Sequence, residues 1–118
     1  AEVLRGRAST PDLQDFINRM VRLYVVYDLM LVCDQHGRVV ACNTVTKTGG
    51  LLDTHNLLGT DVSATDWFKT CMQMPPSQEG AWYSDFTTNP VVASLHSSDG
   101  SGVAFAYPVR DKAGHILG

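Results

Sequence analysis

The sequence predicts an α+β domain in which a five-stranded antiparallel sheet carries a long N-terminal helix on one face and short helices on the other. Three observations lead to this fold class. Residues 10–25 show helical periodicity, and two polar turns, near Gly37 and at residues 111–114, each join two β-rich apolar runs. Such hairpins join antiparallel strands, which excludes the parallel crossovers of a doubly wound fold.

Length and composition indicate one folded domain spanning residues 1–118. A chain of 118 residues can bury a substantial core, and 44% apolar with 18% charged residues is typical of a globular protein. The net charge of -3 comes from residues spread along the chain, without the basic stripe that binds phosphate backbones. No apolar run approaches the ~20 residues that span a bilayer. We therefore expect no nucleic-acid partner and no membrane span within the chain.

The first helix is predicted over residues 10–25. Thr10, Pro11 and Asp12 supply a capping hydroxyl, a proline for the first helical position and an acid near the positive end of the helix dipole. The apolar residues that follow recur at helical spacing: Leu13, Phe16, Ile17, Met20, Val21 and Tyr24. This pattern predicts a helix with one buried side.

The first hairpin is predicted from residues 29–33 and 39–42. Gly37 supplies the positive backbone angle that its turn needs. The register places Cys33 opposite Arg38 or Val39 and not opposite Cys42, so a disulfide between the two cysteines would strain the ladder. We expect all three cysteines, including Cys71, to be small buried residues with free thiols.

The remaining elements follow from turn and capping signals. Residues 44–61 are predicted to form a long loop of the kind that borders binding sites. A helix is expected from about Ala64, with Asp61 or Ser63 as its cap, ending before Pro75. The later elements are a strand at 81–86, a short helix from Asn89 to Leu95, a strand at 103–109, and a turn at 111–114 leading into a strand at 115–117.

The strand at 103–109 is predicted to present two different faces. Its odd positions are large: Val103, Phe105, Tyr107 and Val109. Ala104 and Ala106 are small, and small residues allow a helix to approach a sheet closely. We expect the N-terminal helix on the small face and either the central helix or a cavity on the aromatic face.

Enzymatic and metal-binding motifs are missing from the sequence. It contains no GxSxG, no HExxH and no phosphate-binding glycine loop that ends in GK[ST]. The histidines His36, His55, His96 and His115 are scattered, without the i, i+4 pairing that indicates a metal site, and CxxCH for covalent haem is absent. We therefore predict a protein that is not an enzyme and that holds no cofactor and no metal.

Three segments resemble the Cache domains of bacterial chemoreceptors and sensor kinases. They are GTDVSATDWF at residues 59–68, YSD at 83–85 and FAYPVRDKAGHILG at 105–118. The resemblance covers about residues 29–118, and the segment NPVVASLH resembles the single-Cache variety. Amino-acid-binding members carry an arginine where this chain has Thr65, so the resemblance does not extend to the arginine that pairs with a ligand carboxylate.

The resemblance implies a PAS-like sensor that lies outside the cytoplasmic membrane. It implies a periplasmic domain of an inner-membrane receptor, such as a methyl-accepting chemotaxis protein or sensor kinase, tethered to the membrane by segments outside this chain. It further implies that the domain binds a small organic molecule and transmits a conformational signal. The N-terminal helix is a candidate surface for homodimerisation, since its apolar stripe leaves Leu23 at the edge. The alternative is a PAS-like dimerisation module without a ligand.

Six residues are candidates for the ligand site, and each has a structural alternative. Trp67 and Phe68 either line a pocket or are core aromatics of an amphipathic helix. Tyr83 and Asp85 share one side of a strand, where Asp85 either meets a ligand amine or hydroxyl or caps a turn. Phe105 and Tyr107 are either the floor of a pocket or part of the sheet core.

Overall fold

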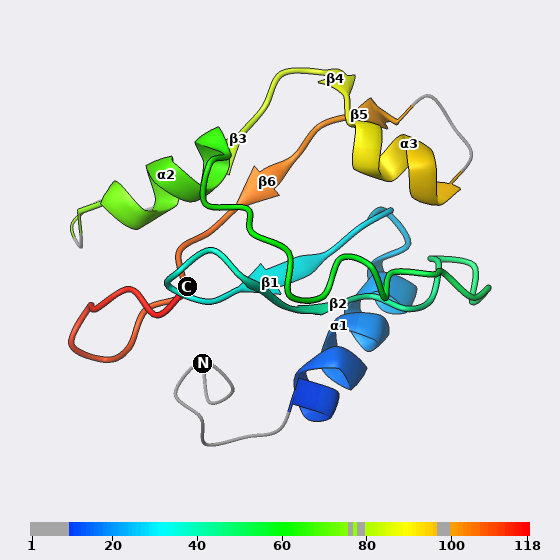
Figure 1. Cartoon of the computed structure of the whole chain (residues 1–118), viewed down its shortest axis with the longest axis horizontal. Helices are drawn as coiled ribbons and strands as arrows, with labels where there is room; N and C mark the ends of the chain where they lie inside the picture. Colours follow the sequence, from blue (N-terminus) through cyan, green and yellow to red (C-terminus); the bar gives the residue numbers. More distant parts are fainter. Residues whose placement is uncertain (1–9, 76, 78–79, 97–99) are drawn as a thin grey trace.

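The computed structural model describes residues 10–75, 77, 80–96 and 100–118, and it confirms an α+β architecture. The helices are α1 (Thr10–Tyr24), α2 (Asp66–Gln73) and α3 (Pro90–His96). The strands are β1 (Leu31–Cys33), β2 (Val39–Cys42), β3 (Trp82–Tyr83), β4 (Thr87–Thr88), β5 (Ser101–Gly102) and β6 (Phe105–Ala106). Figure 1 shows α1 below β1 and β2, with α2 and α3 in the upper part of the molecule.

The strands form three antiparallel pairs, β1 with β2, β3 with β6, and β4 with β5. The predicted antiparallel arrangement is therefore confirmed, whereas a continuous five-stranded sheet is not seen in the described ranges. One cause lies at Ser84, whose hydroxyl accepts the Ala104 N–H at 2.9 Å in place of a backbone carbonyl. A second is Pro108, which has no N–H to extend the ladder. Of the strands predicted at 81–86 and 103–109, the structure therefore shows only Trp82–Tyr83 and Phe105–Ala106 in the β3–β6 pair.

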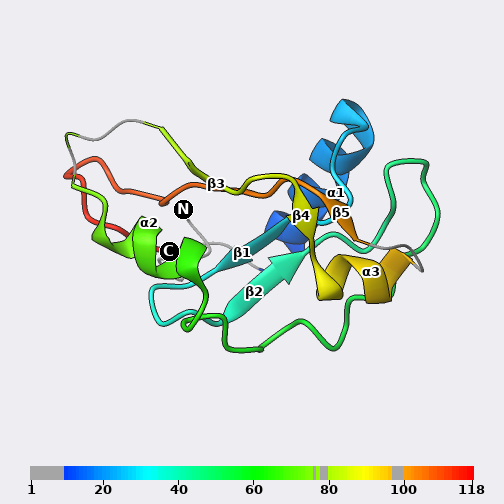
Figure 2. The ribbon, with the colours of Figure 1, turned by 90° about the horizontal axis from the view of Figure 1, so that it is seen from above.

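The main core lies between α1 and the β1–β2 hairpin. Ile17 and Val21 are almost fully buried against Ala41, and partly buried apolar side chains surround them: Leu13, Tyr27, Met30 and Val32. In Figure 2 α1 lies behind the two strands, at the top of the view. The predicted buried side of the helix is confirmed at its centre, but Phe16 is 51% and Tyr24 58% exposed.

The helix that covers the β3–β6 pair is not the one predicted. The helix that contacts both strands is α2, whereas α1 packs against β2. Trp82 and Ala106 pair on one face and are half-buried, while Tyr83 and Phe105 pair on the other and are exposed. The small face thus receives α2, and the expectation that α1 would occupy it is wrong. The α1 helix is instead held on β2, where Ile17 and Val21 pack against Ala41.

The first hairpin follows the predicted register, with Cys33 opposite Val39 and Cys42 opposite Leu31. Gly37 has φ +83°, and a β-carbon there would lie 2.7 Å from the Ser63 Cβ, so only glycine fits. The long loop returns to β2 beside this turn. The Val39 N–H donates to Thr60 O at 3.0 Å, and Val39 O accepts from the Gly59 N–H at 2.8 Å.

The cap of α2 is Thr65, and not Asp61 or Ser63 as predicted. The Thr65 hydroxyl accepts from the Phe68 N–H at 3.4 Å, whereas Asp61 accepts from the Ser63 N–H in the turn before the helix. Arg110 then joins the end of α2 to the C-terminal hairpin. It donates to Met74 O at 2.7 Å and to Gly114 O at 3.0 Å.

Val25, directly after α1, has a left-handed backbone with φ +56°. This conformation costs a β-branched residue about 1–2 kcal/mol, whereas glycine adopts it freely. We expect Val25→Gly to raise the free energy of unfolding by about 1 kcal/mol, measured by chemical denaturation. Val26→Gly is the matched control and should not stabilise, since Val26 has no positive φ. Equal effects of the two substitutions would contradict strain at Val25.

Cys33, Cys42 and Cys71 are all buried free cysteines, as predicted. Burial, followed by the charge of Asp34, raises the pKa of the Cys33 thiol from 9.0 to about 11. Between pH 9 and about 11 the unfolded chain loses this proton and the folded chain keeps it, so the free energy of unfolding should fall as the pH rises. Urea titrations at several pH values should show that the free energy of unfolding falls less steeply with pH in Cys33→Ala than in the wild type. An equal dependence on pH in both proteins would contradict the raised pKa of Cys33.

Candidate functional site

The predicted residues Trp67 and Phe68 lie on α2. Their rings meet edge to face, with centroids 6.3 Å apart. Phe68 is buried and Trp67 is half-buried. Phe68 therefore belongs to the interior under α2, which is the second of the two alternatives considered for this pair.

Tyr83, Phe105 and Tyr107 form an exposed aromatic face on the side of the β3–β6 pair that α2 does not cover. Tyr83 stands opposite Phe105, and Tyr107 is two residues further along the same strand direction. Their exposed fractions are 71%, 63% and 68%. They are packed neither into a core nor around an enclosed cavity in the described part of the chain.

Asp85 is exposed and has no hydrogen-bond partner among the described residues, so it does not cap the turn before Thr87. The six predicted residues therefore separate into two groups, on opposite sides of β3 and β6. The structure does not bring them together around one cavity. A shared role in ligand binding remains a prediction.

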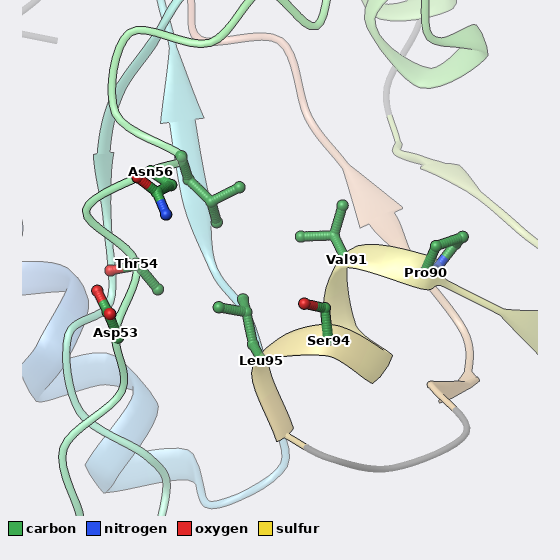
Figure 3. Close-up of a pocket in the computed structure, with 8 residues that line it drawn as sticks. Asp53, Thr54, Asn56, Pro90, Val91, Ser94 and Leu95 are labelled. Carbon is green, nitrogen blue, oxygen red and sulfur yellow. The ribbon is translucent and has the colours of Figure 1, made fainter.

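A groove of about 510 Å³ lies elsewhere, between the long loop and α3 (Figure 3). The loop supplies one wall with Asp53, Thr54, Asn56 and Leu57. The other wall comes from α3 with Pro90, Val91, Ser94 and Leu95. The volume suits a small organic molecule, since ligand pockets usually measure about 300–1,000 Å³. The predicted 44–61 loop thus forms one wall of a groove, and its role in ligand binding stays a prediction.

Short-range hydrogen bonds shape the loop wall. The buried Thr54 hydroxyl donates to Asn43 O at 2.9 Å, and Thr54 O accepts from the Leu57 N–H at 2.9 Å. The Asp53 carboxylate accepts from the backbone and from the ring Nδ1 of His55. These contacts hold the loop as a compact turn at the edge of β2.

The α3 wall begins at the predicted Asn89 cap. The Asn89 side chain accepts from the Val91 N–H at 2.9 Å and from the Val92 N–H at 3.3 Å. Gly100 packs closely under this turn, because a β-carbon there would lie 2.3 Å from Asn89 O. At the other end, His96 Nε2 donates to Asp28 O at 2.9 Å.

Both walls are thus connected to the segment between α1 and β1, through Asn43 and Asp28. The buried Asn43 side chain accepts from the Met30 N–H at 2.9 Å and donates to Val45 O at 2.9 Å and to Asp28 O at 3.4 Å. Beside it, Asn18 of α1 accepts from the Thr44 N–H at 2.7 Å. Hydrogen bonds through Asn43, Asp28 and Thr44 thus lead from each wall to Asn18 on α1.

The chemistry of the groove is that of a binding site with one charge. Asp53 is the only charged residue among the eight that line it. Hydrogen bonds from His55 lower the pKa of the Asp53 carboxyl below its ordinary value of 3.8, so it is an anion at neutral pH. No group of three potential metal ligands occurs in residues 10–75, 77, 80–96 and 100–118.

Partial signals for this groove are present in the sequence. The Asn-Pro start of α3 and the loop-forming glycines were recognisable, but the role of Asn43 was not. An asparagine at the end of an apolar run signals a strand end, and its burial depends on contacts with residues as distant as Asp28. The side chains of the groove come from segments more than 30 residues apart, so no local spacing marks them.

No helix within the described ranges combines the length and the apolar character needed to cross a bilayer. No model of a known protein family, no curated protein and no solved structure matches this chain.

Proposed function

We propose that this chain is a ligand-sensing domain of the PAS-like Cache type, from the extracytoplasmic part of a bacterial transmembrane signalling receptor. It binds a small organic molecule without chemical conversion and passes the event to a chemotaxis or two-component output. The observation that carries the proposal is the groove. Its α3 wall hydrogen-bonds to Asp28 in the segment between α1 and β1, and its loop wall reaches that segment through Asn43. A ligand that favours one position of these walls would change the packing of α1.

The finer fold is part of the same proposal. The five predicted strands, at residues 29–33, 39–42, 81–86, 103–109 and 115–117, would form one antiparallel sheet, in which β6 continues into the first strand of the C-terminal hairpin. The C-terminal hairpin supports this, because the Leu117 N–H donates to Val109 O at 2.7 Å and the Val109 N–H to Gly118 O at 2.8 Å. Each of the pairs β1–β2 and β3–β6 is antiparallel, as such a sheet requires.

The function is tested by measuring the melting temperature of the protein with a library of amines, amino acids, organic acids and polyols. A ligand that binds the folded state raises the melting temperature, since 100 times the Kd adds about 2.7 kcal/mol. Ser94→Phe, which places a large side chain in the groove, should abolish the effect. If no compound changes the melting temperature of the wild type, the sensing function is wrong.

The route from the groove to α1 gives a further prediction. In the wild type, a ligand from this screen should shift the amide NMR signals of both the 53–57 loop and Asn18 and Val21 of α1. His96→Ala removes the contact with Asp28 O. The loop signals should still move, whereas the shifts in α1 should shrink by about half, because one of the two connected walls is released. Unchanged shifts in α1 would exclude this route.

The exposed aromatic face favours a second candidate function, a PAS-like dimerisation module without a ligand. Exposed apolar side chains gathered on one face are typical of interfaces, and Leu23 on α1 is also 64% exposed. Sedimentation over a range of concentrations distinguishes the two functions. A ligand-free dimer together with a silent ligand screen supports the module, whereas a monomer that binds a library compound supports the sensor.

A further inference from the structure

We propose that the groove between residues 53–57 and α3 binds a small alkylammonium ligand, with the cationic group at Asp53 and the alkyl part against Val91 and Leu95. This inference rests on the proposed sensing function, for which it names the class of ligand. It concerns a site that none of the six sequence-predicted residues lines.

The charge of the groove selects a cation. Asp53 is the single charged lining residue, and no lysine or arginine lines the groove to pair with an anionic ligand. Both hydrogen bonds from His55 reach Oδ1 of Asp53. Oδ2 has no partner among the described residues, so it is available to an ammonium group. Lys47, which belongs to the same loop, pairs through its Nζ with Asp28 at 3.2 Å.

Uncharged polar groups can complete the contacts of an ammonium or of a neighbouring hydroxyl. The Asn56 amide and the Ser94 hydroxyl have no hydrogen-bond partner within the described part of the chain. Figure 3 shows Asn56 on the loop side of the groove and Ser94 on the α3 side. Thr54, by contrast, already donates its hydroxyl hydrogen to Asn43 O.

The other half of the groove is apolar. Leu57 comes from the loop, and Pro90, Val91 and Leu95 come from α3. In Figure 3 Val91 and Leu95 face the loop across the gap. An alkyl chain that binds there is removed from contact with water, so each added methylene should tighten binding about two- to fourfold. Asp53 is exposed, so its ion pair adds only about a two- to fivefold preference for a cation.

The test is an NMR titration of the whole chain with n-butylammonium, n-butanol and n-butyrate. We expect n-butylammonium to bind tightest and to shift the amide signals of residues 53–57 and 90–96. Methylammonium should bind more weakly than n-butylammonium. Asp53→Asn should weaken n-butylammonium about two- to fivefold and leave n-butanol unchanged. Asp66→Asn, which removes an exposed carboxylate at the start of α2, is the matched control and should change neither affinity.

Several results would overturn the proposal. Equal or tighter binding of n-butyrate, shifts confined to other segments, or an unchanged affinity in Asp53→Asn each exclude a cation site at Asp53. The amide spectrum of each variant shows whether it is folded. If the compound library finds a ligand for the groove that is not an amine, the amine assignment fails and the sensing function stands. If neither amines nor any other compound binds, both fail.

Discussion

Replacing Asn43 with leucine should lower the free energy of unfolding by about 3 kcal/mol. The Asn43 side chain is fully buried and accepts from the Met30 N–H while donating to Val45 O. Leucine has a similar size but cannot hydrogen-bond, so these backbone groups would remain buried without partners. Each such group costs about 1–3 kcal/mol. Urea denaturation of the wild type and the variant measures the difference.

A second asparagine serves as the control for this substitution. Asn56 is exposed and has no hydrogen-bond partner among the described residues. Asn56→Leu should therefore change the free energy of unfolding by no more than about 0.5 kcal/mol. Similar losses in the two variants would show that Asn43 does not hold the buried contacts described here.

Ile17→Ala should lower the free energy of unfolding by about 3 kcal/mol, because it leaves a cavity where α1 meets Ala41. Ile17 is 1% exposed, and its neighbour Phe16 is 51% exposed. Phe16→Ala removes a larger side chain yet should cost less than about 1 kcal/mol, since half of the ring is already in water. Thermal and urea unfolding of the two variants compare the sites. A larger loss in Phe16→Ala would place the core on another face of α1.

The parts of the fold that local patterns determine were predictable. The helix at 10–24, the Asn89 cap, the glycine turn at 37 and the Cys33 register depend on residues within a few positions of each other. Propensity, capping and turn chemistry act over that range. These elements therefore agree with the sequence to within a residue or two.

Pairing between distant segments was not predictable in the same way. Alternation at residues 103–107 correctly separated large from small positions, but it could not tell which helix covers which face. The Ala104 N–H donates to the hydroxyl of Ser84 and not to a backbone carbonyl, which interrupts the ladder. The periodicity of the sequence does not indicate such a side-chain hydrogen bond. The sequence predicts the aromatic positions as a pocket floor or part of the sheet core, whereas they are exposed in the structure.

The candidate site shows the same limit. The sequence predicts a site at Tyr83, Phe105 and Asp85, because aromatic and acidic residues often line pockets. The groove instead combines unremarkable residues, such as Thr54 and Ser94, from segments that meet only in the folded chain. Two predicted elements, the loop of residues 44–61 and the short helix from Asn89, form the walls of the groove, but none of the six predicted site residues lines it.

The return of the long loop to β2 affects how copies of this protein meet one another. Unpaired N–H and C=O groups on an outer strand are a template for aggregation. Here the backbone of Val39 is paired with Gly59 and Thr60, and Thr44 O accepts from the Leu52 N–H at 2.9 Å. The outer side of β2 is therefore shielded at both ends, which leaves fewer unpaired backbone groups there for the addition of a strand from another molecule.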